Sequence, residues 1–382
     1  MKTIKSITFA IAVLLLFGIS ANAQTTIYAL GSEVIIEDDF DIIDFDTRQI
    51  FQMTFGPTTL YTINPQTGEK SEVGSTGFRE CAGLDIHPGT GEFYAVCNRI
   101  LEDDDNGFPG DIIQLGEDEG IGQFLVLIDK NTGEGTEIGP LGDRIGYDGN
   151  FITDISFRED GVLFAYFICQ SCQRSGSILK TTNNVEELEG NALGILNLNT
   201  GAFTPVGETG VQDSIAAIGF TAAQVLDHCA TSFLKEADFL ESRMLNQFSG
   251  VSTYVRDIIP PADFADFRKS ISSKDADMTS GNMYGFFLAE EDDDDDGPSP
   301  AELATRNIAA TGSFLTMIDP NTGLLNIIGQ TAGTQEAMLA IAVKGEPRMV
   351  PTMSEYGLII TGILFLGAAV LYLRRRRLNT EI

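Results

Sequence analysis

The sequence has no tryptophan, only two histidines, and 24 basic residues against 55 acidic ones. A formal net charge of −31 speaks against nucleic acid or an anionic membrane surface as a partner, because both repel an acidic protein. With only His87 and His228 available, no Ser-His-Asp set stands out, and no zinc-protease helix motif or phosphate-binding loop is present. Carboxylate pairs of the kind that cleave glycosides stay open, since their separation is a property of the fold.

The first 23 residues have the pattern of a targeting segment. Residues 1–23 combine Lys2 and Lys5 with an apolar run and end in Ala21-Asn22-Ala23. This order is typical of a secretory signal peptide that is cleaved before Gln24. An uncleaved anchor is the alternative, but the apolar run is shorter than a membrane span requires.

The C-terminal end holds the second long apolar run. Residues 358–373 are apolar or small, and the tail 374–382 begins with Arg374, Arg375, Arg376 and Arg377. The pattern predicts a transmembrane helix, with the arginines holding the tail inside and the bulk of the chain outside. A buried core helix is the alternative, yet nothing apolar follows and four arginines suit a headgroup layer. We therefore expect an exported ectodomain over residues 24–346, in the cell envelope or at the cell surface.

The segment 347–357, directly before that apolar run, contains a short motif. Its residues are Val350, Pro351, Thr352, Met353, Tyr356 and Gly357. Together with the arginines, they resemble the IPTL-CTERM bacterial protein-sorting signal, in which Ile-Pro-Thr-Leu and Trp-Gly precede an apolar helix and arginines. Pro, Thr and Gly match, and the other three positions are conservative departures. The resemblance implies a surface or secreted bacterial protein that is processed by a membrane sorting protease.

The middle of the chain repeats one phrase. Copies begin at Leu60, Phe124, Ala192 and Phe314, each with a strand, a turn ending in Thr-Gly, and a strand closing on Ile-Gly or Val-Gly. Two further segments of alternating apolar residues follow the first two phrases, which makes four strands in meander order, whereas the third and fourth repeats are incomplete. This order predicts an all-β protein, a β-propeller with four visible repeats, and leaves open a fifth within 222–280. The repeat resembles quinoprotein-like and YVTN-type propellers, although the absent tryptophan speaks against a quinone dehydrogenase.

Two segments depart from the regular repeat. Apolar residues between Val225 and Phe248 have helix-like spacing, which predicts a helical insertion over 222–280. After the fourth phrase a final strand is missing, and Thr26–Leu30 resembles it. We therefore expect the first strand of the mature protein to complete the last blade and to remove the open sheet edge.

Acidic runs lie in the loops between the predicted strands. The residues that alternate before a glycine are Glu102, Asp104 and Asn106 in one loop, and Asp292, Asp294 and Asp296 in another. Carboxylates at alternate positions can wrap a hard cation, so these loops are candidate Ca²⁺ sites, Ca²⁺ being the one cofactor that the sequence suggests. The acid that closes an EF-hand loop is misplaced in both, and a solvated acidic loop is the alternative.

The cysteines fit an exported protein. Cys81 and Cys97 lie symmetrically about a predicted hairpin turn, so we expect a disulfide between them. Cys169 and Cys172 form a C-x-x-C pair without the thioredoxin-like setting of a redox site, which favours a disulfide that pins a loop. Cys229 is left unpaired.

The sequence favours a binding, adhesion or structural module over an enzyme. Its expected partners are the membrane, a sorting protease, and an extracellular protein or polysaccharide. A hydrolase or lyase that acts on extracellular polymer with channel carboxylates is the alternative. Carboxylates that converge on a channel pocket favour the enzyme, whereas an exposed apolar patch favours the binding module.

Overall fold

The protein is described here by a computed structural model. The residues that it describes are 25–35, 54–99, 122–142, 145, 150–169, 179–180, 187–188, 190–211, 214–221, 223–232, 240–262, 267–277, 280–291, 312–333 and 336–344. All of them belong to one compact unit, Gln24–Gly345. This part of the chain is all-β, with strands joined by turns and without an α-helix.

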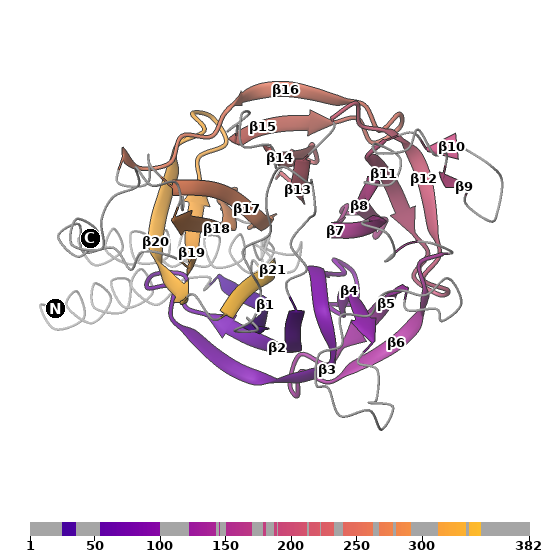
Figure 1. Ribbon diagram of the computed structural model, residues 1–382, viewed down its shortest axis with the longest axis horizontal. Coiled ribbons are helices and arrows are strands. Elements are labelled where there is room, and N and C mark those ends of the chain that lie inside the picture. The colour runs from indigo at the N-terminus through magenta and orange to yellow at the C-terminus, as the bar shows by residue number, and fades with distance from the viewer. Residues whose placement is uncertain are drawn as a thin grey trace, which may run out of the picture. The chain divides into compact units, whose positions relative to one another are not determined.

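Most of the strands form five antiparallel, four-stranded blades (Figure 1). From the inside outward, blade 1 contains β21 (Glu336–Lys344), β1 (Thr26–Ile35), β2 (Thr54–Ile63) and the first half of β3 (Lys70–Ile86). Blade 2 contains the second half of β3, β4 (Phe93–Arg99), β5 (Gln123–Ile128) and β6 (Gly135–Pro140). The long strand β3 thus joins blades 1 and 2 into one seven-stranded sheet.

The other three blades are separate sheets. Blade 3 contains β7 (Asn150–Phe157), β8 (Leu163–Cys169), β11 (Ala192–Leu196) and β12 (Phe203–Glu208). Blade 4 contains β13 (Ser214–Phe220), β14 (Leu226–Ser232), β15 (Leu240–Leu245) and β16 (Ser252–Asp257). Blade 5 contains β17 (Phe267–Ala276), β18 (Met283–Glu291), β19 (Gly312–Ile318) and β20 (Leu325–Ala332). A short hairpin of β9 (Leu179–Lys180) and β10 (Glu187–Leu188) stands apart from them.

The innermost strands of the five blades surround a common axis. Each of β21, β3, β7, β13 and β17 contacts the next, and β17 returns to β21. The predicted closure by the first strand is confirmed, because β1 pairs with β21 in antiparallel register, Tyr28 opposite Ala342. Apolar clusters fill the layers between neighbouring blades, as where Val96 of blade 2 packs with Phe167 of blade 3. The core is therefore divided among the blade interfaces.

The repeated phrase forms the outer hairpin of each blade, so it marks the rim of a blade and not its beginning. Asp319 shows how the turn forms: its carboxylate accepts the N–H of Asn321 at 2.8 Å, and Gly323 adopts a φ of 75°. An asparagine or aspartate that bonds its own turn, followed by a glycine at positive φ, is the usual chemistry of such turns.

The glycine that closes the phrase has a separate role in blade packing. A Cβ on Gly139 of blade 2 would overlap the carbonyl oxygen of Thr200, in the turn of blade 3. The same close approach joins Gly74 to the turn of blade 2, Gly207 to that of blade 4, and Gly329 to that of blade 1. The turn glycine and the closing glycine of the phrase thus allow the backbones of neighbouring blades to approach closely. We call this ring of contacts around the rim the glycine belt.

The predicted helical insertion over 222–280 is wrong. This stretch contains β14, β15 and β16 of blade 4 and the innermost strand β17 of blade 5. The stretch contains a fifth copy of the phrase with altered residues. Its turn, from Asn246 to Gly250, has Ser249 in place of the threonine, and its second strand has Arg256 in place of the closing glycine. Apolar residues on both faces and at the tip of this hairpin imitate helical spacing, which explains the error.

Candidate functional site

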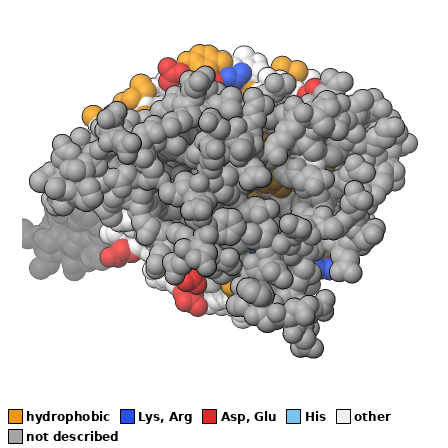
Figure 2. Space-filling model, in the orientation of Figure 1, with side chains coloured by type: hydrophobic (Ala, Val, Ile, Leu, Met, Phe, Trp, Pro, Cys, Tyr) orange, Lys and Arg blue, Asp and Glu red, His pale blue; other side chains and the backbone are white. Residues whose placement is uncertain are grey.

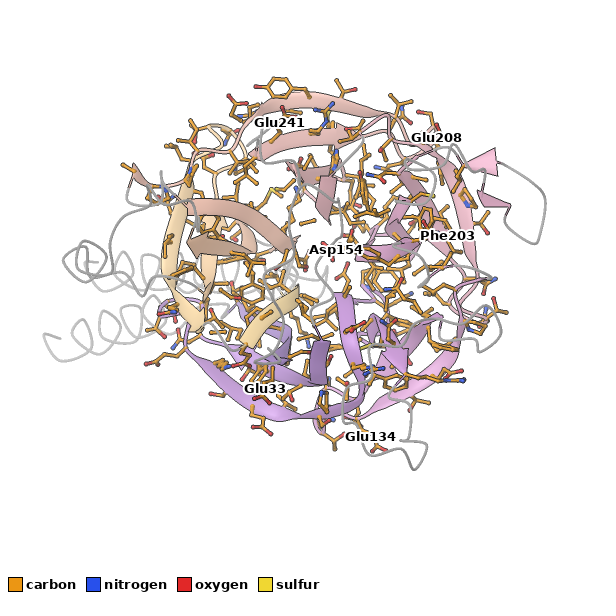
Figure 3. The ribbon with its side chains drawn as sticks, viewed as in Figure 1. Glu33, Glu134, Asp154, Phe203, Glu208 and Glu241 are labelled. Atoms are coloured by element: carbon orange, nitrogen blue, oxygen red, sulfur yellow. A yellow bond between two sulfur atoms is a disulfide. The ribbon has the colours of Figure 1, made fainter. Side chains whose placement is uncertain are left out.

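Three aspartates lie on innermost strands near the propeller axis. Asp85 on β3, Asp154 on β7 and Asp275 on β17 are buried, and Figure 3 shows Asp154 near the centre of the ring. Each carboxylate accepts the N–H of the next residue and an N–H from a neighbouring blade. The donors on the neighbouring blades are Phe157, Ile218 and Val343, at 2.5, 2.9 and 2.6 Å. The carboxylates thus connect innermost strands that do not pair with each other.

The environment of these carboxyl groups favours the protonated form. Burial raises the pKa of Asp85 to about 7, although the N–H of Phe157 opposes this shift. Burial also raises the pKa of Asp154 and that of Asp275 well above the usual range, and the nearby Asp85 carboxyl adds to the shift of Asp275. Carboxyl groups with raised pKa are suited to proton transfer near neutral pH.

The bonding of Asp154 argues for a structural role. One oxygen of its carboxylate accepts bonds from Ile155 and from the Ser273 hydroxyl at 3.1 Å, and the other accepts from Ile218. Its side chain is fully buried, so a substrate has no direct access to it. We call Asp85, Asp154 and Asp275 the axial aspartates and interpret them first as structural residues whose hydrogen bonds hold neighbouring blades together. The sequence reasoning did not single them out; the available signal was a carboxylate inside an otherwise apolar strand, close to the hairpin turn.

A second group of buried polar side chains lies where blade 4 meets blade 5. The Lys274 ammonium is 3.0 Å from an oxygen of the Asp227 carboxylate, and the Lys274 side chain is completely buried. Burial acts to lower the pKa of Lys274, but the Asp227 carboxylate and the Cys229 side chain together outweigh it and hold the pKa above its usual value. Burial raises the pKa of the neighbouring Cys229 thiol to about 11. The adjacent His228 faces the other side of the sheet, where its ring stacks on Tyr166 of blade 3, and burial lowers its pKa well below its usual value.

These polar residues replace apolar ones of the other blades. At the positions of Asp227, His228 and Cys229, the other second strands have an aromatic residue, a small residue, and an aliphatic or aromatic residue. These triplets are Tyr28-Ala29-Leu30, Tyr94-Ala95-Val96, Phe164-Ala165-Tyr166 and Tyr284-Gly285-Phe286. The position of Lys274 is occupied elsewhere by Leu84, Ile155, Ile218 and Ile341. The interface between blades 4 and 5 is therefore the polar exception among the blade interfaces.

The outer hairpin of blade 4 also differs from the others on its exposed side. Large apolar side chains that are exposed in the described part of the chain gather here, and we call them the rim strip. Its members are Met244, Phe248, Val251, Tyr254, Val255, Ile259 and Leu324. Ile259 connects the strip to blade 5, since it accepts a bond from Leu325 and forms a bridge with Leu324. Figure 2 shows hydrophobic side chains along the upper edge, where β16 lies in Figure 1.

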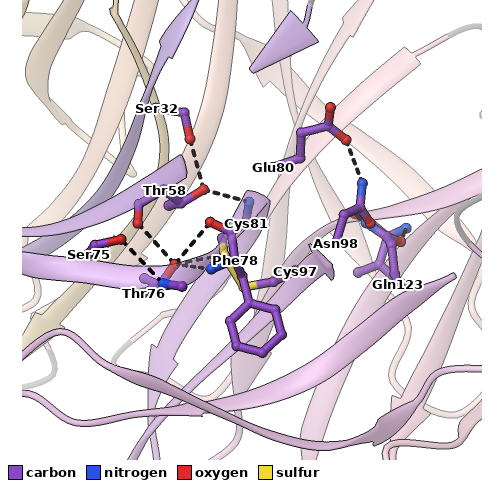
Figure 4. The surroundings of a disulfide bond; sticks show 12 residues. Ser32, Thr58, Ser75, Thr76, Phe78, Glu80, Cys81, Cys97, Asn98 and Gln123 are labelled. Atoms are coloured by element: carbon purple, nitrogen blue, oxygen red, sulfur yellow. Dashed lines mark hydrogen bonds between the residues drawn. A yellow bond between two sulfur atoms is a disulfide. The ribbon is translucent and has the colours of Figure 1, made fainter. Parts of the chain in front are cut away.

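The structure places Cys81 and Cys97 in a disulfide between β3 and β4 (Figure 4). Its surroundings are hydrogen-bonded: the Thr76 hydroxyl donates to the Thr58 carbonyl, and the Thr58 hydroxyl accepts the N–H of Cys81. Cys169 is also disulfide-bonded, whereas Cys172 lies outside the described residues. Cys229 is a free, buried thiol.

The other predicted sites lie outside the described residues. These are the acidic loops with Glu102 and Asp292, the sorting motif at Pro351, and the arginines from Arg374. The residues that the structure describes contain no cluster of three acidic, histidine or cysteine side chains able to hold a metal ion. They also include no helix that is long and apolar enough to span a membrane, and the apolar run 358–373 is not among them.

No family model and no curated protein matches this chain. Among solved structures, it is similar to a GH43 β-xylosidase/α-arabinofuranosidase from a compost microbial metagenome, with 12% identity, a TM-score of 0.43, and coverage of 80% of this chain and 91% of that one. A chain of a nidogen/laminin complex has 7% identity and a TM-score of 0.40, with coverage of 83% and 98%. A protein of unknown function from Bacteroides caccae has 11% identity and a TM-score of 0.36, with coverage of 85% and 100%. At these scores the likenesses carry no argument about activity or ligand.

Proposed function

We propose that this protein is an exported β-propeller that acts as a binding or adhesion module in the cell envelope, with the rim strip as its binding surface. The observation that carries the proposal is the gathering of seven exposed apolar side chains in a chain with a net charge of −31. Five of them lie on the outer hairpin of blade 4, and Ile259 and Leu324 lie beside it. Monomeric proteins rarely expose contiguous apolar patches of more than a few hundred Å², and larger patches mark interaction sites. The segments 1–23 and 358–373 provide export and anchoring in this proposal.

A polymer-acting hydrolase is the second candidate, and the axial aspartates are the observation in its favour. Asp85 and Asp275 are slightly exposed and have raised pKa values, as a general acid requires. Against this role, both oxygens of each carboxylate already accept backbone N–H groups. Three carboxyl groups bonded in this way favour a scaffold over a reaction centre.

Cell adhesion tests the binding function directly. Cells that produce the full chain are compared with cells that produce Phe248→Asn/Val251→Glu/Tyr254→Glu, on lawns of producing cells, lawns of non-producing cells and cellulose-coated surfaces. We expect adhesion by the wild type to at least one of the three surfaces and its loss in the variant at equal surface abundance. Equal adhesion of the two strains to all three surfaces would contradict the proposal.

Polysaccharide hydrolysis tests the second candidate. Release of reducing sugar from xylan, arabinan and β-1,3-galactan is measured for the full chain and for Asp85→Asn. We expect no release above that of a heat-denatured sample. Turnover that disappears in Asp85→Asn, while the variant keeps its thermal unfolding transition, would establish the hydrolase instead.

Calcium stabilisation is a separate element of the proposal. The loops with Asp292, Asp294 and Asp296, and with Glu102, Asp104 and Asn106, have the alternating oxygen ligands that Ca²⁺ prefers. Millimolar Ca²⁺ is expected to raise the melting temperature of the wild type and not that of Asp292→Asn/Asp294→Asn/Asp296→Asn. An unchanged melting temperature, with no heat of binding in calorimetry, would remove calcium from the proposal.

A further inference from the structure

We infer that the partner of the rim strip is a second copy of this chain, with the two copies joined by their blade 4 hairpins. This inference rests on the proposed function and names the partner of the same surface. Homotypic contact of this kind would make the protein a self-recognising adhesion module, on one membrane or between two.

The hairpin tip provides the first observation. The residue two places before the turn glycine is Gln66, Asn131, Asn199 and Asn321 in blades 1, 2, 3 and 5. In blade 4 it is Phe248, and its side chain is 86% exposed. The fold does not need an aromatic residue here, because four equivalent turns form with a polar one. Phe248 therefore serves something outside its own blade.

The outer strand provides the second observation. Tyr254 is 48% exposed, at the position that is occupied by Glu72 in blade 1 and Glu137 in blade 2. β16 is the outermost strand of its sheet, and no described strand pairs with its outer side. Native proteins usually protect such edges with charges, proline or bulges, since a free edge is a template for another strand. β16 has an irregularity at Val255 and two charged residues, Arg256 and Asp257, at its end, but its Thr-Tyr-Val sequence favours pairing.

The size of the strip suits a protein partner. Fully exposed aromatic side chains offer about 150–250 Å² each, and the seven residues of the strip together offer on the order of 700 Å². A standard specific interface buries ~800 Å² on each partner. Aliphatic members such as Met244, Val251 and Ile259 also favour a protein surface over a sugar, which is bound mainly through hydrogen bonds.

The charge of the blade 4 hairpin favours a second copy of this chain over other protein partners. Over residues 240–257, Glu241 and Asp257 are balanced by Arg243 and Arg256, whereas the outer hairpins of the other four blades each carry a net negative charge. Two copies of a chain with a net charge of −31 repel each other least where these neutral hairpins meet. A cationic partner would find stronger attraction on any other blade.

A two-fold axis makes the contact self-complementary. When β16 of one copy lies antiparallel to β16 of the other, the same residues face each other in reverse order. Centred on Tyr254, this arrangement places the two Tyr254 residues opposite each other, Arg256 opposite Ser252 and Asp257 opposite Val251, so no like charges oppose each other. The two Phe248 side chains then lie at the two ends of the interface.

Cysteine cross-linking in cells that produce the full chain tests this contact. Thr253→Cys introduces a thiol on β16, and Thr136→Cys introduces one at the equivalent exposed position of β6 as a matched control. Among the native cysteines that the structure describes, Cys229 is buried and Cys81, Cys97 and Cys169 are in disulfides, so the unsubstituted chain treated in the same way measures the background. After treatment with a short bis-maleimide, we expect a band at twice the monomer mass, at least tenfold stronger for Thr253→Cys than for Thr136→Cys.

A second set of variants separates the contact from folding. Thr253→Cys is combined with Phe248→Asn, Val251→Glu and Tyr254→Glu, residues that other blades already have at these positions. We expect cross-linking to fall to the level of Thr136→Cys while the melting temperature and surface abundance persist. Equal cross-linking at both positions, or cross-linking that survives the triple change, would overturn the inference. A Thr253→Cys product with a different protein would also overturn it, while strip-dependent adhesion would still support the binding function.

Discussion

Blade 4 and the other four blades are built to one plan with different residues. The plan consists of two inner strands, an outer hairpin with a turn of the Asn/Asp type, and a contact of each turn with the neighbouring rim. In blades 1, 2, 3 and 5 the second strands have aromatic and small residues at the positions of Asp227 and His228, and the tips of the turns are polar. Blade 4 reverses both choices, with Asp227 and His228 inside and Phe248 and Tyr254 outside. The difference shows which features of the repeat serve folding and which are free to serve another purpose.

The backbone contacts around the rim show which residues of the repeat the fold requires. Four blades have the closing glycine of the phrase in the outer strand, and blade 4 has Arg256 at this position. The turn of blade 5 therefore contacts the carbonyl of the next residue, Asp257. A shift of one residue in the contact is therefore enough to replace a glycine by a long side chain. The repeat tolerates this change because the contact is made by backbone atoms.

The largest expected effect concerns the buried ion pair of blades 4 and 5. Asp227→Ala leaves the Lys274 ammonium buried without its partner, so we expect a loss of about 3 to 5 kcal/mol in the free energy of unfolding. Asp227→Phe combined with Lys274→Leu restores the residue types of the other blades and is expected to bring stability back to near the wild-type value or above it. Urea unfolding of the single and double variants measures both. A double variant no more stable than Asp227→Ala would show that the polar residues are required at this interface.

The glycine belt gives the next effect. Gly139→Ala places a Cβ against the carbonyl oxygen of Thr200, so the two blades must move apart at a cost of about 1 to 3 kcal/mol. Arg256→Ala, at the equivalent position of blade 4, introduces no overlap and is expected to cost less than about 1 kcal/mol. Thermal unfolding compares the two variants. Similar losses in both would mean that the glycines are not kept for close approach.

The axial aspartates predict a dependence of stability on pH. An aspartate titrates near pH 4 in an unfolded chain, whereas the pKa of Asp85 in the folded protein is about 7. The folded state then binds more protons between these values, so this group's stabilisation is complete below pH 4 and is lost as the pH rises through 7. Asp85→Asn is expected to reduce the fall in unfolding free energy between pH 4 and pH 8 by a few kcal/mol, because each unit between the two pKa values corresponds to ~1.4 kcal/mol. An identical pH profile for the variant would refute the raised pKa.

Much of the fold could be predicted from the sequence, and blade 4 shows why the rest could not. Local geometry alone determines the strand period and the turn residues of the repeated phrase, so its copies at Leu60, Phe124, Ala192 and Phe314 could be recognised. The closing strand at Thr26 has the same strand pattern. The hairpin of blade 4 keeps the geometry with Ser249 and Arg256, so a search for the same letters missed it. The axial aspartates were missed because their partners are backbone amides of other blades, which a sequence does not identify.

The smallest expected effect concerns the reactivity of Cys229. This thiol interrupts the apolar pattern of the second strands and lies beside Lys274, a setting that on the surface would activate a cysteine. Burial instead raises its pKa to about 11, and the side chain is almost fully inaccessible. We expect no labelling of Cys229 by iodoacetamide in the folded protein at pH 8 over an hour, and complete labelling in urea, measured by intact mass. Rapid labelling of the folded protein would mean that blades 4 and 5 separate readily, and that the polar residues between them serve movement and not packing.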